Sequence, residues 1–103
     1  MRIIFALLAI LYTVQPAFAA DQRESYITIE RDTLYAIADR ADIYGDHAMW
    51  IAIWEANKDV LQSPHAVPAG VTLRIPRDLS MLEILNYRQR AENYKREDND
   101  DNF

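Results

Sequence analysis

Two segments typical of β-strands lie on either side of two short helical segments, and this order restricts the fold more than any other feature. Residues 26–29 are β-branched or aromatic, and residues 71–75 alternate in polarity before Pro76. Apolar residues recur at helical spacing from Leu34 to Ala41, and a second helix is predicted from about His47 to Ala56. The strands can bury their apolar faces only if they pair, most simply antiparallel, and if both helices cover one side. The predicted fold class is therefore α+β, with a βααβ order.

Capping residues mark the expected helix starts. Asp32 or Thr33 can accept hydrogen bonds from the first amides of the first helix, and Asp46 can do so for the second. Ser80 and Glu83 fit a capping box, which begins a third helix over residues 81–95. Its apolar positions recur at intervals of three and four: Met81, Ile84, Tyr87, Ala91 and Tyr94.

Residues 1–19 are predicted to be a secretory signal peptide. Arg2 supplies the charged start, Ile3 to Val14 the apolar run, and Ala17 to Ala19 the small-residue cleavage site. The apolar run is shorter than the ~20 residues that a membrane-spanning helix needs. We therefore expect a periplasmic or secreted protein with no stable membrane insertion after cleavage.

Differences in composition divide the rest of the chain into four segments. We expect a polar lead over residues 20–24, one domain over residues 25–76 and an amphipathic C-terminal helix within residues 77–96. Residues 97–103 are rich in acidic side chains and predict a disordered tail.

Composition narrows the range of possible functions. The net charge of the whole chain is −5, and it becomes more negative when Arg2 is removed with the signal, which disfavours nucleic acid and anionic lipid as partners. The chain has no cysteine, so packing alone must stabilise it. About 84 residues remain after cleavage, which is small for a deep substrate cavity. These properties favour a binding module over an enzyme, and no cofactor is predicted.

Three motifs within residues 25–76 resemble a LysM domain. They are DTL-x-x-IA at Asp32 to Ala38, IYGD with W-x-x-I-x-x-AN at Ile43 to Asn57, and G-x-x-L-x-I-P at Gly70 to Pro76. The resemblance implies a βααβ module that binds N-acetylglucosamine-containing glycans such as peptidoglycan or chitin. The middle motif is similar to the form with a long second helix, which occurs in bacterial envelope proteins.

The resemblance also implies a site. In the family, the sugar lies in a shallow groove between two loops, which here are residues 30–34 and 57–61. Arg31 stands where the family usually has a glycine before the DTL triplet. An N-acetyl group needs polar partners beside a small apolar patch, which Leu34, Val60 and Leu61 could supply. The candidate glycan-binding residues are Arg31, Asp32, Thr33, Leu34, Tyr35, Asn57, Asp59, Val60 and Leu61.

Several candidate residues have a structural interpretation beside the functional one. Asp32 and Thr33 can contact sugar hydroxyls, but helix capping is the favoured role. Asn57 is expected to close the end of the second helix with side-chain hydrogen bonds that can also shape the groove. Tyr35 lies off the apolar stripe of its helix, so it is either a sugar-contacting ring or a surface tyrosine. Trp50 and Trp54 could stack on sugars, but a small domain needs them in its core.

Metal binding and catalysis are not predicted. His47 and His65 are eighteen residues apart and match no usual metal-ligand spacing. No serine has a nucleophile motif, and nothing predicts two carboxylates held across a cleft.

The sequence therefore predicts non-catalytic binding of peptidoglycan, which would localise the protein at the cell wall. The alternative is an envelope adaptor or structural protein whose LysM scaffold no longer binds glycan. Its protein partner would use the helix at residues 81–95, where Tyr87, Ala91 and Tyr94 either pack on the domain or remain free. Packing on the domain is the favoured interpretation.

Overall fold

The computed structural model describes residues 22–100, which form one small α+β unit. The elements in chain order are β1 (Ser25–Ile27), α1 (Leu34–Asp39), the 3-10 helix η3 (His47–Met49), α2 (Trp50–Ala56), β2 (Thr72–Arg74) and α3 (Met81–Asp100). β1 and β2 pair antiparallel, with Tyr26 opposite Leu73. The predicted α+β class and antiparallel ribbon are thus confirmed. The predicted signal peptide and the end of the predicted tail, residues 1–19 and 101–103, lie outside the described residues.

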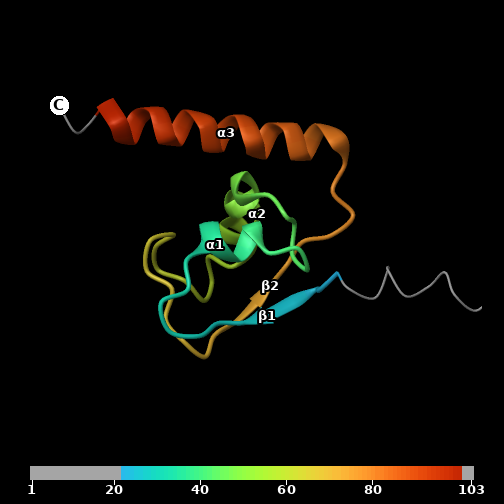
Figure 1. Ribbon diagram of the computed structural model, residues 1–103, viewed down its shortest axis with the longest axis vertical. Coiled ribbons are helices and arrows are strands. Elements are labelled where there is room, and N and C mark those ends of the chain that lie inside the picture. Colours follow the sequence, from blue (N-terminus) through green and yellow to red (C-terminus); the bar gives the residue numbers. More distant parts are fainter. Residues whose placement is uncertain (1–21, 101–103) are drawn as a thin grey trace, which may run out of the picture.

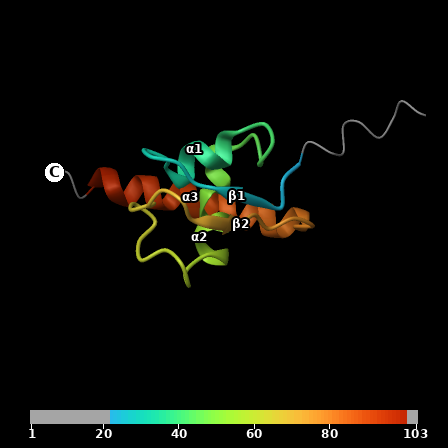
Figure 2. The same cartoon turned by 90° about the horizontal axis from the view of Figure 1, so that it is seen from below.

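The elements form three layers. α1 and α2 cover one side of the β-ribbon, and α3 lies across the opposite side of these helices (Figures 1 and 2). Between the ribbon and the two short helices lies the core, in which Leu34, Ile37, Ile43, Ile53 and Leu73 are the largest fully buried apolar side chains.

The strands are shorter than predicted, but Thr28 continues the pairing beyond them. Its amide donates to the Val71 carbonyl and its carbonyl accepts from the Gly70 amide, both at 2.9 Å. Its hydroxyl donates to the carbonyl of Pro68 at 2.7 Å and accepts from the amide of Val71 at 2.9 Å. The Thr28 side chain is 3% exposed, so these bonds occupy two backbone groups that water does not reach freely. The Thr28 side chain thus reinforces the backbone pairing where the chain after β1 meets the chain before β2.

The predicted helix starts are largely confirmed. The Thr33 hydroxyl accepts from the amide of Ala36 at 3.0 Å and caps α1, and Asp46 caps η3. Ser80 and Glu83 form the reciprocal capping box, with both hydrogen bonds at 3.1 Å. The predicted second helix is divided, because a 3-10 turn precedes α2.

α3 is longer than predicted. It runs to Asp100, so residues 97–100, which the sequence predicts as disordered, are helical. Once the capping box has started the helix, each added residue gains one backbone hydrogen bond. This gain outweighs the low helix propensity of the Asp and Asn residues at its end. Across residues 22–100, no helix combines the length and the apolar character needed to cross a bilayer.

The two tryptophans lie at the margin of the core rather than inside it. Trp50 and Trp54 are half-buried, while Ile51, Ala52 and Ile53 between them form the buried part of α2. The prediction that the indoles close the core is therefore only partly correct. Both rings face α3, which supplies a second surface for them to pack against.

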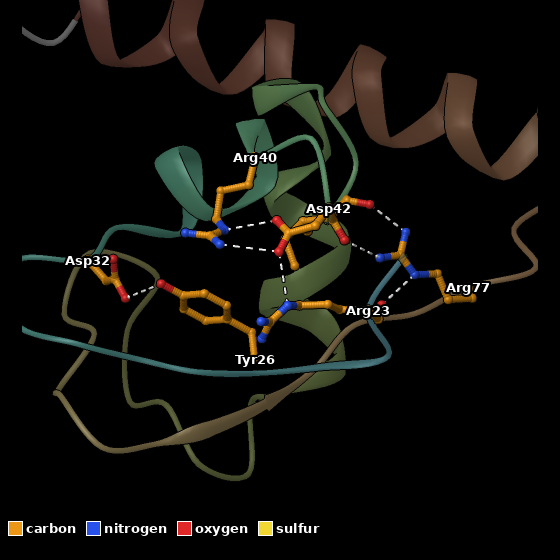
Figure 3. Close-up of polar contacts among 7 residues, drawn as sticks. Arg23, Tyr26, Asp32, Arg40, Asp42 and Arg77 are labelled. Atoms are coloured by element: carbon orange, nitrogen blue, oxygen red, sulfur yellow. Dashed lines mark hydrogen bonds and ion pairs between the residues drawn. The ribbon is translucent and has the colours of Figure 1, made fainter. Parts of the chain in front are cut away.

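A polar network joins the N-terminal segment, the loop after α1 and the segment after β2 (Figure 3). The Asp42 carboxylate accepts from Arg40 at 3.0 Å and pairs with Arg23 at 2.9 Å. The Arg77 guanidinium donates to the backbone carbonyls of Arg23, Asp42 and Ile43. Three segments that are distant in sequence are thereby fixed at the point where the chain turns toward α3.

Asp42 gives the fold a pH dependence. Its hydrogen bond from Arg40 lowers the pKa of the carboxyl, so the ionised form stabilises the native state. That contribution is complete above the unfolded-state pKa of ~3.9 and disappears as the pH falls through the lower folded pKa. We expect Asp42→Asn to have a lower urea midpoint than the wild type at pH 7, and the difference to shrink as the pH falls from 4 to 2.5.

The matched control is Glu30→Gln, because the Glu30 carboxylate is exposed and makes no ion pair among residues 22–100. Its urea midpoint should follow the wild type at both pH values. A difference between Asp42→Asn and wild type that is as large at pH 2.5 as at pH 7 would contradict the assigned ion pairs.

Candidate functional site

The turn before α1 is built by Asp32 and Arg31. The Asp32 carboxylate accepts from the amide of Ile29 at 2.8 Å and from the hydroxyl of Tyr26 at 2.9 Å. Asp32 therefore closes the turn instead of capping the helix, which corrects one of the two predicted capping roles (Figure 3). Burial raises the pKa of the Tyr26 hydroxyl, and the hydrogen bond to Asp32 adds to that effect.

Arg31 occupies the one turn position that favours glycine. Its φ is +69°, in the left-handed region that side chains with a Cβ disfavour. The glycine that the resembling family has at this place would adopt the same conformation without that cost.

The second predicted loop has a mainly structural role. The Asn57 side chain is fully buried, donates to the carbonyls of Ile53 and Arg74 and accepts from the Arg74 amide. Its predicted role in closing α2 is confirmed. Asp59 pairs with the Arg74 guanidinium at 2.7 Å.

Only one of the three residues of the predicted apolar patch is exposed. Leu34 and Leu61 are each 2% exposed and belong to the core, whereas Val60 is 43% exposed. Spacing alone could not separate Val60 from Leu61, because the packing of an irregular loop decides which of two adjacent residues is turned inward.

A cleft lies between the start of α1, η3 and α3, and we call it the α1–α3 cleft. Its volume is about 400 Å³. Of the nine predicted site residues, Thr33, Leu34 and Tyr35 line it. The other lining residues are His47, Ala48, Trp50, Pro64, His65, Arg88, Ala91, Glu92, Tyr94 and Lys95.

The structure thus brings the first predicted loop to a cleft but does not bring the second one there. The α2–β2 connection contributes Pro64 and His65 instead of residues 57–61, and α3 supplies a wall that was not predicted. The spacing of Tyr87, Ala91 and Tyr94 did predict that one face of this helix packs on the domain, but it did not predict a cleft there.

α3 is held on the domain by both polar and apolar contacts. Arg88 pairs with Asp46, at 2.6 Å from the nearest guanidinium nitrogen, and Arg90 pairs with Glu55. The hydrogen bond from Arg90 lowers the pKa of the Glu55 carboxyl. Tyr87 packs against the core, so the prediction that this helix packs on its own domain is confirmed.

Aromatic rings shape the cleft. Tyr35, which is 50% exposed, stacks on His47 with ring centroids 4.4 Å apart. On the other side, Tyr94 meets Trp50 edge to face at 5.2 Å and hydrogen-bonds to the His65 ring. Such rings offer flat apolar faces with polar edges, which suits a ring-shaped ligand that carries both apolar faces and hydroxyl groups.

Comparisons with known proteins give one partial match. A potassium binding protein Kbp of Escherichia coli O6:H1 is 37% identical to this chain over 65 residues. The match covers 63% of this chain and 42% of that protein, so the chain spans less than half the length of this curated relative. No protein-family model matches the chain, and no solved structure matches it significantly.

The backbone of Arg31 leads to a stability prediction. Arg31→Gly should stabilise the fold by about 0.5–1 kcal/mol, because relief of the left-handed conformation outweighs the greater unfolded-state entropy of glycine. Urea unfolding at pH 7 measures the change. The control is Glu30→Gly, one residue earlier and without a positive φ, which should lower stability by up to about 1 kcal/mol. If Arg31→Gly also lowers stability, the turn does not have the left-handed conformation described.

Proposed function

We propose that the chain is a non-catalytic module that binds N-acetylglucosamine-containing glycans, above all peptidoglycan. The observation that carries this proposal is the α1–α3 cleft of about 400 Å³, which is lined by the ring pair Tyr35 and His47 and by the ring pair Trp50 and Tyr94. Stacked rings beside hydroxyl and imidazole groups are the surface that a pyranose with apolar faces and polar edges requires.

The resemblance of residues 25–76 to a LysM domain supports the same proposal. Its DTL motif contributes Thr33 and Leu34 to the cleft. We propose that the domain is a LysM module of a bacterial envelope protein, periplasmic or secreted, and that glycan binding localises it at the cell wall. A single shallow site implies weak binding, which several copies on one polymer would strengthen.

Tyr35→Ala tests the proposal, because Tyr35 is half-exposed at the cleft and is not part of the core. Loss of its ring should weaken binding to chitotetraose about three- to tenfold, which corresponds to ~0.7–1.4 kcal/mol. Isothermal titration with the soluble oligosaccharide gives Kd, and co-sedimentation with insoluble peptidoglycan tests the natural polymer.

Val60→Ala is the matched control, because Val60 is an exposed apolar residue of the originally predicted groove that does not line the cleft. It should leave Kd unchanged. If Val60→Ala weakens binding while Tyr35→Ala does not, the glycan binds between the two loops rather than in the cleft. If the wild type binds neither chitotetraose nor peptidoglycan, the glycan proposal is wrong.

The name of the relative raises potassium as another ligand to test. Proteins bind K⁺ through oxygen atoms, as the carbonyl-lined filters of potassium channels do. Among residues 22–97, no group of three or more His, Cys, Asp or Glu side chains could hold a metal ion, but a carbonyl-lined K⁺ site needs no such group. Titration with KCl against NaCl, in the same calorimeter, tests this ligand directly.

A second proposal, an envelope adaptor, rests on the N-terminal end of α3. The predicted stripe of Tyr87, Ala91 and Tyr94 faces the domain, but Met81 and Leu82 are 69% and 79% exposed. Apolar side chains at one helix end, together with the half-exposed Leu85, offer a small surface to a protein partner. This proposal gains support if glycan binding is absent.

A further inference from the structure

Two ionisable side chains of α3 line the α1–α3 cleft without a charged partner. Glu92 and Lys95 both line the cleft, and among residues 22–97 neither lies within 4.0 Å of an opposite charge, including each other. Arg88, the third charged residue of the lining, is already paired with Asp46. An acceptor and a donor are therefore available on one wall of a cleft that aromatic rings also line.

The spacing places these two groups side by side. Residues three apart on a helix lie on the same face, with Cβ atoms about 5–6 Å apart. Both side chains are long, so the carboxylate and the ammonium group can reach neighbouring atoms of one ligand. Ala48 and Ala91, which also line the cleft, are small and leave room for a methyl-sized group.

We infer that Glu92 and Lys95 select a sugar that carries an acetamido group. The amide N–H of that group can donate to the Glu92 carboxylate, and its carbonyl can accept from the Lys95 ammonium. A hydroxyl at the same ring position has its donor and its acceptor on a single oxygen atom, so it can bond to both groups only if both reach that one atom. It also has no methyl to fill the space beside Ala48 and Ala91. This inference rests on the proposed function, and it places the specificity of the cleft on α3, outside residues 25–76.

The test compares chitotetraose with cellotetraose, in which each acetamido group is replaced by a hydroxyl group. The wild-type chain from Ala20 to Phe103 should bind chitotetraose about tenfold more tightly, because only the acetamido group offers a separate donor and acceptor to the two charged side chains together with a methyl group. Glu92→Met/Lys95→Met should reduce this ratio to about threefold or less while cellotetraose still binds. The double change keeps the net charge, the side-chain length and a good helix propensity.

The matched control is Arg96→Met/Glu97→Met, which makes the same charge-neutral change on α3 at residues that do not line the cleft. It should keep the wild-type ratio. If the helix of the first double variant is lost, as shown by circular dichroism, Lys95→Met alone serves in its place.

The outcomes separate the two proposals. A wild type that binds both oligosaccharides equally, or a Glu92/Lys95 variant that keeps the full preference, overturns the role of α3 but leaves the proposed function intact. A wild type that binds neither oligosaccharide overturns both.

Discussion

The side chain of Asn57 joins the end of α2 to β2, and the remainder of the structure depends on this joint. Its amide makes three hydrogen bonds with the backbone of Ile53 and Arg74 and is fully buried. An unpaired amide in this place would cost about 1–3 kcal/mol, so the helix end and the strand cannot separate without a large loss. The joint places Leu73 in the core, and β2 in turn fixes β1 through their pairing.

The orientation of α2 then determines the candidate site. With Ile53 turned toward the ribbon, Trp50 and Trp54 are directed toward the opposite side, where α3 covers them. Tyr87 and Tyr94 pack α3 against this side of the domain, with Tyr94 in contact with Trp50. The ion pairs of Arg88 and Arg90 also hold α3 on the domain. The α1–α3 cleft is the space that remains where α3 passes the start of α1 and η3 without filling the gap.

Much of the fold could be predicted from local pattern. The order of elements, the capping box at Ser80 and the closing role of Asn57 follow from residues close in sequence, because caps and amphipathic stripes act within one or two turns. Thr33 and Asp32 were both plausible caps, and the bonds that Asp32 accepts from the Ile29 amide and the Tyr26 hydroxyl separate their roles. The inward turn of Leu61 and the marginal place of the tryptophans depend on contacts with distant segments, which a local pattern does not contain.

The candidate site was less predictable than the fold for the same reason. The family resemblance covers residues 25–76, whereas five of the residues that line the cleft belong to α3. A resemblance confined to the module could not assign them, and the helical stripe showed only that α3 packs on something. The charged side chains of the cleft thus come from α3, which lies outside the part of the chain that resembles the family.

We propose that the glycan binds in the α1–α3 cleft. A ¹⁵N-labelled chain, from Ala20 to Phe103, titrated with chitotetraose and followed by amide chemical shifts, tests it without any substitution. We predict that the shifts gather at residues 33–35, 47–50, 64–65 and 88–95, which meet only in this cleft. Shifts confined to residues 57–61 and the ribbon, with α3 unchanged, would contradict the claim.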